Sequence, residues 1–159
     1  MKKQNGALVN TVRLLASIVL CQSVGFAGAI FTIPAIKGWY QTINKPSFNP
    51  PSWIFSPVWT VLFLLMGISL YLVWKKGINT KAIMLFVAQL ALNFFWSVLF
   101  FGLESPGLAF IDLVLLWAAI LATILVFSKV SKLAGLLLLP YLLWVTFAGV
   151  LNFAIYILN

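Results

Sequence analysis

The chain has 159 residues, of which 64% are apolar and 8% charged, whereas an average soluble domain has roughly 45 to 50% apolar and about 25% charged residues. Ten Lys and Arg with two Asp and Glu cannot cover the surface that a soluble domain of this size exposes, which excludes an ordinary soluble globule. The net charge of +8 comes from a near absence of acids, and no basic helix face exists that could bind nucleic acid.

Five runs of about 20 mostly apolar residues follow one another, each long enough to cross the hydrocarbon part of a bilayer. They predict helices at about 8–30, 53–74, 82–102, 107–128 and 134–157. These helices take up most of the sequence, so residues 1–159 are expected to form a single transmembrane domain. The predicted fold class is an all-α integral membrane protein, a bundle of five transmembrane helices.

The longest connection, residues 31–52, separates the first two predicted helices. It contains Pro34, Pro46, Pro50 and Pro51, and this proline content predicts an irregular segment and not a continuous helix. It is the one connection long enough to act as a lid over an end of the bundle.

Basic residues are divided unequally between the two sides of the predicted bundle. The side of the amino terminus carries eight: Lys2, Lys3, Arg13, Lys75, Lys76, Lys81, Lys129 and Lys132. The opposite side carries only Lys37 and Lys45. Because cytoplasmic flanks of membrane helices are rich in Lys and Arg, we expect a multi-pass protein of a prokaryotic cell membrane. Its amino terminus is expected in the cytoplasm and its carboxyl terminus outside.

An alternative concerns the first helix. Basic residues near the start, an apolar run and the small residues Ala27-Gly28-Ala29 resemble a signal peptide with its cleavage site. Apolar residues nevertheless continue through Ile36, which favours a first helix that is retained in the membrane.

Two predicted helices each carry amide and aromatic side chains on one face. The first set is Gln89, Asn93, Trp96 and Phe100, and the second is Tyr141, Trp144, Ala148 and Asn152. Within each set, successive residues are three or four positions apart, which places the set on one stripe of its helix. Amides are costly in a bilayer unless they face protein, water or a polar ligand. Two interpretations stay open, namely hydrogen bonds between helices or the lining of a ligand pocket.

Asp112 is the only carboxylate within a predicted span, and an ionisable group at such a position is a functional candidate. The alternative is a structural pair with Lys37 or Lys45. One acid cannot form a carboxylate dyad. The sequence has no His and only one cysteine, Cys21, which removes the usual metal ligands and the usual axial haem ligand. We therefore expect no metal site and no required cofactor.

Several motifs carry a family resemblance from about residue 39 to the end of the chain. They are Trp39-Tyr40, the stretch from Lys45 to Trp53 with its three prolines, Pro57-Val58-Trp59, Gln89-Leu90-Ala91-Leu92-Asn93 with Trp96, Phe100-Phe101-Gly102, Asp112, Pro140-Tyr141-Leu142 with Trp144, Phe147-Ala148 and Leu151-Asn152. With these motifs the sequence resembles the TspO/MBR family, which comprises tryptophan-rich sensory proteins and translocator proteins (peripheral benzodiazepine receptors).

The resemblance implies a five-helix bundle, commonly a homodimer, with a hydrophobic pocket beneath the loop between helices one and two. It implies a membrane receptor or transporter-like protein that binds porphyrins or haem-like tetrapyrroles, or other flat hydrophobic molecules, and senses or transports them. The resemblance and the two stripes together give the candidate ligand-binding residues Trp39, Tyr40, Pro46, Pro50, Pro51, Trp59, Gln89, Asn93, Trp96, Tyr141, Trp144, Phe147, Ala148 and Asn152.

Two other functions remain as alternatives. The first is an enzyme that degrades porphyrin oxidatively in light, with Trp59 and Trp144 as the catalytic candidates. The second is a sterol-binding or lipid-binding protein, or a structural partner in a membrane assembly. The sterol pattern of animal members needs a basic residue after a tyrosine, and none follows Tyr156 here. Sterol binding is therefore unsupported. The sequence offers no acid–base apparatus and no set of metal ligands for an enzyme, so we expect a binding protein and not an enzyme.

Overall fold

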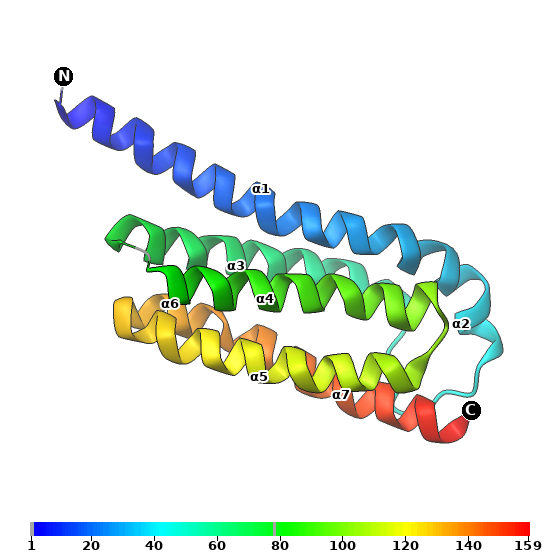
Figure 1. The fold of residues 1–159 in the computed structure, drawn as a ribbon. Coiled ribbons are helices and arrows are strands. Elements are labelled where there is room, and N and C mark those ends of the chain that lie inside the picture. Colours follow the sequence, from blue (N-terminus) through cyan, green and yellow to red (C-terminus); the bar gives the residue numbers. More distant parts are fainter. Residues whose placement is uncertain (1, 78) are drawn as a thin grey trace.

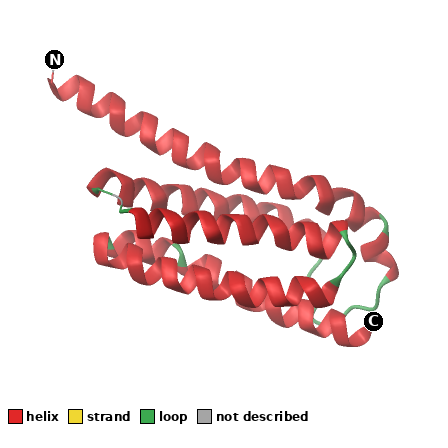
Figure 2. Ribbon diagram, in the orientation of Figure 1, coloured by secondary structure: helices red, strands yellow, loops and turns green. Residues whose placement is uncertain are grey.

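The computed structural model of the protein describes residues 2–77 and 79–159, with side chains from Gly6 onward. The elements are α1 (Lys2–Lys37), α2 (Trp39–Thr42), the 3-10 helix η1 (Ser52–Ile54), α3 (Phe55–Lys76), α4 (Thr80–Ser97), the π-helical turn η2 (Val98–Gly102), α5 (Pro106–Val130), α6 (Lys132–Leu137) and α7 (Leu139–Leu158). Figure 2 shows helices joined by short loops, without a strand in the described ranges.

Five stretches are long and apolar enough to cross a membrane, and they lie side by side as a bundle (Figure 1). They are Gly6–Lys37, Ser52–Lys76, Thr80–Gly102, Pro106–Val130 and Lys132–Leu158. The predicted all-α five-helix fold is confirmed. The fifth span consists of two helices, because the chain leaves regular helix at Leu138 and α7 begins again with Pro140 in its first turn.

The start of the predicted loop 31–52 is wrong. α1 continues to Lys37 with Pro34 inside it, and α2 covers four more residues. Proline removes one backbone N–H from the helix, but a helix remains the way to satisfy all the other backbone groups beside lipid. The Gly38 N–H donates to the carbonyls of Pro34 and Ala35 and closes the helix end. We call residues 38–51 the lid, and the end of the bundle that they cover the lid end.

Close contacts between small and large residues fix the position of α1 on α3. A Cβ atom on Gly67 would lie 2.7 Å from the Ile18 Cα atom, and one on Gly25 would lie 2.6 Å from the Phe63 ring. Glycine therefore allows the two helices to approach at both levels. Further along the chain, α4 packs on α5, α5 packs on α7, and α3 packs on α6. Towards its amino terminus, α1 diverges from this bundle (Figure 1).

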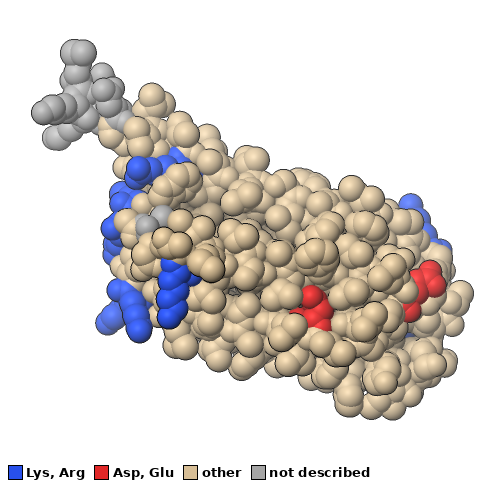
Figure 3. All heavy atoms as spheres, in the orientation of Figure 1, with Lys and Arg blue, Asp and Glu red and all other residues tan. Residues whose placement is uncertain are grey.

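Basic side chains gather at the two ends of the bundle (Figure 3). Most belong to the end opposite the lid, where α3 and α5 finish and α4 and α6 begin (Figure 1). The described side chains at that end are Arg13, Lys75, Lys76, Lys81, Lys129 and Lys132, whereas Lys37 and Lys45 lie at the lid end. The long apolar surface between the ends exposes many large aliphatic side chains, as expected of helices that face lipid.

Candidate functional site

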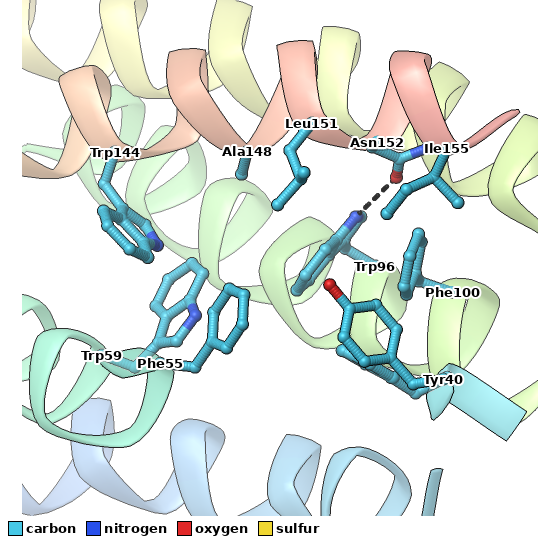
Figure 4. Close-up of a pocket in the computed structure, with 11 residues that line it drawn as sticks. Tyr40, Phe55, Trp59, Trp96, Phe100, Trp144, Ala148, Leu151, Asn152 and Ile155 are labelled. Carbon is cyan, nitrogen blue, oxygen red and sulfur yellow. Dashed lines mark hydrogen bonds between the residues drawn. The ribbon is translucent and has the colours of Figure 1, made fainter. Parts of the chain in front are cut away.

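An aromatic cluster fills the bundle below the lid (Figure 4). Trp59 of α3 belongs to this cluster, with its ring centroid 6.3 Å from that of Trp96 and 6.2 Å from that of Tyr141. Trp96 stacks on Phe100 at 5.5 Å, and the Tyr40 ring of the lid lies tilted against Phe100 at 6.2 Å. Three transmembrane helices and the lid therefore meet through aromatic rings.

A small cavity, which we call the inner pocket, lies inside this cluster. Its volume is about 20 Å³, which leaves room for about one water molecule. The lining residues come from the lid, α3, α4, η2 and α7, and they are Tyr40, Phe55, Trp59, Trp96, Phe100, Phe101, Trp144, Ala148, Leu151, Asn152 and Ile155. Protein side chains thus fill most of the space that the sequence predicts for a ligand.

A larger cavity of about 270 Å³, which we call the side cavity, lies between α1, α3 and α4. Its wall includes Gln22, Gly25, Gly28 and Thr32 of α1 and Ser56, Thr60, Asn93 and Ser97 of α3 and α4. Phe55, Trp59, Trp96 and Phe101 line both cavities. These four aromatic side chains therefore form the partition between the inner pocket and the side cavity.

Among the side chains that the structure describes, those lining the two cavities are all uncharged. Their polar groups are hydroxyls, amides and indole nitrogens, several of which already bond neighbouring helices. The Asn93 side-chain nitrogen donates to the Tyr141 hydroxyl at 3.0 Å. Trp96 Nε1 donates to Asn152 Oδ1 at 3.1 Å, and the Asn152 nitrogen donates to the Pro106 carbonyl at 2.7 Å. Asn93 and Asn152 therefore form hydrogen bonds between helices, which is the first of the two interpretations, and they also line cavities.

The lid carries its own polar network around Tyr40. The Tyr40 hydroxyl donates to Asn49 Oδ1 at 2.6 Å. The Lys45 ammonium donates to the Tyr40 carbonyl at 2.6 Å and to the Ile43 carbonyl at 2.9 Å, and it lies 5.0 Å from the centre of the Tyr40 ring. Burial raises the pKa of Tyr40 to about 12, and the bond to Asn49 partly opposes that rise. Tyr40 is therefore neutral at physiological pH and acts as a hydrogen-bond donor.

Other candidates from the sequence lie beside the cavities without lining them. Trp39 packs edge-on against Phe100 at 5.5 Å, and Phe147 packs against Trp144, also at 5.5 Å. Tyr141 is fully buried behind Trp59. Three lid prolines, Pro46, Pro50 and Pro51, belong to neither wall. Trp39, Phe147 and Tyr141 therefore pack against residues that line the inner pocket, whereas the three prolines only belong to the lid above it.

Gln89 and Asp112 are buried polar residues with side-chain atoms that have no hydrogen-bond partner among the described residues. Gln89 is 1% exposed, and neither of its side-chain polar atoms has a partner within the described ranges. Asp112 is 7% exposed, and its Oδ2 atom is likewise unpaired there. The Lys45 ammonium binds carbonyls of the lid, and the unpaired Asp112 Oδ2 atom gives no support, within the described residues, to the alternative in which Asp112 pairs with Lys37 or Lys45.

Sequence reasoning missed part of both walls. Leu151 and Ile155 line the inner pocket, and they continue the stripe of Ala148 at spacings of three and seven residues, so that periodicity could have identified them. The α1 wall of the side cavity gave no comparable signal. Its contribution combines small and weakly polar residues with large apolar ones such as Phe26 and Ile33, and their role depends on their position next to α3 and α4.

The comparison with known proteins decides the family. Residues 17–158 match the TspO/MBR family. This chain belongs to the TspO/MBR family. Family membership and the five apolar spans together make the protein a multi-pass integral membrane protein.

Relatives within the TspO/MBR family occur in archaea, bacteria and animals. The chain is 46% identical over 153 residues to the tryptophan-rich protein TspO of Archaeoglobus fulgidus, covering 95% of this chain and 99% of that protein. It is 40% identical over 145 residues to protein CrtK of Rhodobacter capsulatus, covering 89% of each. It is 41% identical over 143 residues to the translocator protein of Homo sapiens, covering 86% of this chain and 85% of that protein.

Proposed function

We propose that this protein is a membrane receptor or transporter-like protein that binds porphyrins and related tetrapyrroles at the aromatic partition below the lid. The observation that carries the proposal is the shared wall of Phe55, Trp59, Trp96 and Phe101, which separates two uncharged cavities. Rotation of these side chains would join the cavities into one site.

The chemistry of the wall suits a flat apolar macrocycle. Indole and phenyl rings stack on planar ligands, and a few fixed polar groups orient them. Ligand pockets of this kind usually measure about 300 to 1,000 Å³, and the side cavity alone, at about 270 Å³, is close to the lower bound. The carboxylates at one edge of a porphyrin would be costly to bury among uncharged residues. We therefore expect that edge to face the lid end, where Lys37 and Lys45 lie.

The names of the relatives support a role in sensing or transport. They include a translocator protein and, in Cereibacter sphaeroides, a tryptophan-rich sensory protein that is 37% identical over 121 residues. A homodimer in a prokaryotic cell membrane, with the lid end outside, is part of the same proposal.

Titration with protoporphyrin IX tests the proposal through the intrinsic tryptophan fluorescence of the protein in detergent. We expect saturable quenching because the ligand stacks on Trp59 and Trp144. Trp144→Phe and Asn93→Ala should weaken the apparent affinity about tenfold, which is the order expected when one stacking or polar contact is lost. The matched control is Trp117→Phe, since Trp117 lies outside both cavities and donates to Thr146 at 2.9 Å. Unsaturable quenching, or equal weakening in the control, would contradict the proposal.

Light-dependent porphyrin breakdown is the second candidate function. It is favoured by one observation, the presence of both Trp59 and Trp144 in the wall of the inner pocket. Such a reaction would use molecular oxygen as the oxidant. Illumination of the complex separates the two functions, because an enzyme would convert many porphyrin molecules without loss of tryptophan. A binding protein would show a single photochemical event at most.

A further inference from the structure

Hydrogen bonds join the lid to the carboxyl-terminal end of α7. The Asn44 backbone N–H donates to Asn159 Oδ1 at 2.9 Å, and the Asn159 side-chain nitrogen donates back to the Asn44 carbonyl at 3.0 Å. The Asn44 side chain also donates to the Leu158 carbonyl at 3.2 Å. We call these three hydrogen bonds the Asn44–Asn159 contact.

Several other hydrogen bonds begin and end between residues 40 and 49 of the lid. Lys45 binds the carbonyls of Tyr40 and Ile43, Tyr40 binds Asn49, and the Asn49 N–H donates to the Pro46 carbonyl at 3.0 Å. These internal hydrogen bonds hold residues 40–49 together as one unit. Movement of the lid relative to α7 would therefore break the Asn44–Asn159 contact and leave the internal bonds intact.

The Asn44–Asn159 contact lies beside the inner pocket. The Asn159 side-chain nitrogen also donates to the carbonyl of Ile155 at 2.9 Å, and Ile155 lines the inner pocket from α7. Tyr40 lines the same pocket from the lid. The contact therefore connects the lid wall of the pocket with its α7 wall.

We propose that the Asn44–Asn159 contact holds the lid closed and controls access from the aqueous phase to the inner pocket. In the closed state the pocket has a volume of about 20 Å³ and excludes any molecule much larger than water. Asn44 and Asn159 are both exposed, so water competes for their hydrogen bonds and each bond adds little net stability. The Asn44–Asn159 contact can therefore break without unfolding the bundle. The inference deepens the proposed function, since it concerns access to the same pocket.

A cysteine-modification experiment tests this inference without a tetrapyrrole. The single native cysteine, Cys21, is buried and is replaced by alanine, and Leu151→Cys then places a thiol in the wall of the inner pocket, where Leu151 is 6% exposed. The probe is a cationic methanethiosulfonate reagent. Its charge prevents approach through lipid, so the modification rate reports access from the water at the lid end.

The expected changes in rate follow from the number of bonds removed. Asn159→Ala deletes the side chain that makes two of the three bonds and should raise the modification rate about tenfold, whereas Asn44→Ala deletes one bond and should raise it about threefold. Both side chains are exposed, so neither substitution creates a cavity in the packed interior.

The matched control is Thr42→Ala. Thr42 is an exposed lid residue whose hydroxyl donates to the Trp39 carbonyl at 2.8 Å, a bond that does not reach α7. Its substitution should leave the rate at the parent value. An unchanged rate in Asn159→Ala, or an equal increase in Thr42→Ala, would overturn the inference. Since the assay contains no porphyrin, a failure of porphyrin binding would overturn the proposed function and leave this result standing.

Discussion

Single residues on α4 show how far a sequence pattern can be interpreted. The spacing of Gln89, Asn93 and Trp96 correctly indicated one buried face. It could not distinguish their partners, because the hydrogen-bond partners of Asn93 and Trp96 lie on another helix, α7. Asn93 and Trp96 bind Tyr141 and Asn152, whereas the Gln89 amide has no partner among the described residues.

This difference predicts opposite effects for two neighbouring amides. Gln89→Met should raise the free energy of unfolding by about 1 to 3 kcal/mol, because it removes a buried amide without hydrogen bonds and keeps a similar volume. Asn93→Leu should lower it by a similar amount, because the Tyr141 hydroxyl then loses its donor. Thermal unfolding of both variants in one detergent measures the two effects. A loss of stability in Gln89→Met would show that the amide has a partner, such as a buried water molecule.

At the scale of helices, the sequence predicted the five spans but placed some boundaries wrongly. Hydrophobic length determines where a chain can cross a bilayer, and this is readable without a structure. The helical state of residues 31–37 was not readable, since Pro34 is a helix breaker in most contexts. Likewise, the sequence did not indicate that α3, at Gly67, is the helix that α1 approaches.

Helix approach at Gly67 gives a prediction with a matched control. Gly67→Ala would place its Cβ 2.7 Å from the Ile18 Cα atom, a backbone atom that cannot rotate away. α1 would have to shift, and we expect a loss of about 1 to 3 kcal/mol in unfolding free energy. In Gly149→Ala the new Cβ atom has no neighbour within 4 Å, and the higher helix propensity of alanine should raise the unfolding free energy by up to about 1 kcal/mol. Equal thermal stabilities of the two variants would contradict the close contact.

For the whole molecule, the distribution of basic residues separates the two ends. Six described basic side chains lie at the end opposite the lid, and Lys37 and Lys45 lie at the lid end. The positive-inside rule then predicts that the lid faces outward. The arrangement of the helices would be the same with the lid facing outward or facing the cytoplasm. The orientation therefore depends on how the basic residues interact with the membrane.

Labelling of intact bacterial cells with a membrane-impermeant maleimide measures the orientation. In a Cys21→Ala background, Phe48→Cys on the lid should react, because Phe48 is 48% exposed at the end predicted to lie outside. Thr80→Cys, an exposed residue at the first turn of α4, should react only after the cells are opened. Neither substitution changes a charge, so the basic distribution is preserved. The reverse pattern of labelling would place the lid in the cytoplasm.

The sequence by itself determined the membrane environment, the number of spans and the family, because these depend on composition, apolar length and local motifs. It also identified Trp59, Trp96 and Trp144 as inward-facing candidates, which line the inner pocket. Tertiary structure decided the division into an inner pocket and a side cavity, the α1 wall, and the Asn44–Asn159 contact. Each of these joins residues distant in the chain, and the free energy of such contacts depends on the packing of helices that no local pattern specifies.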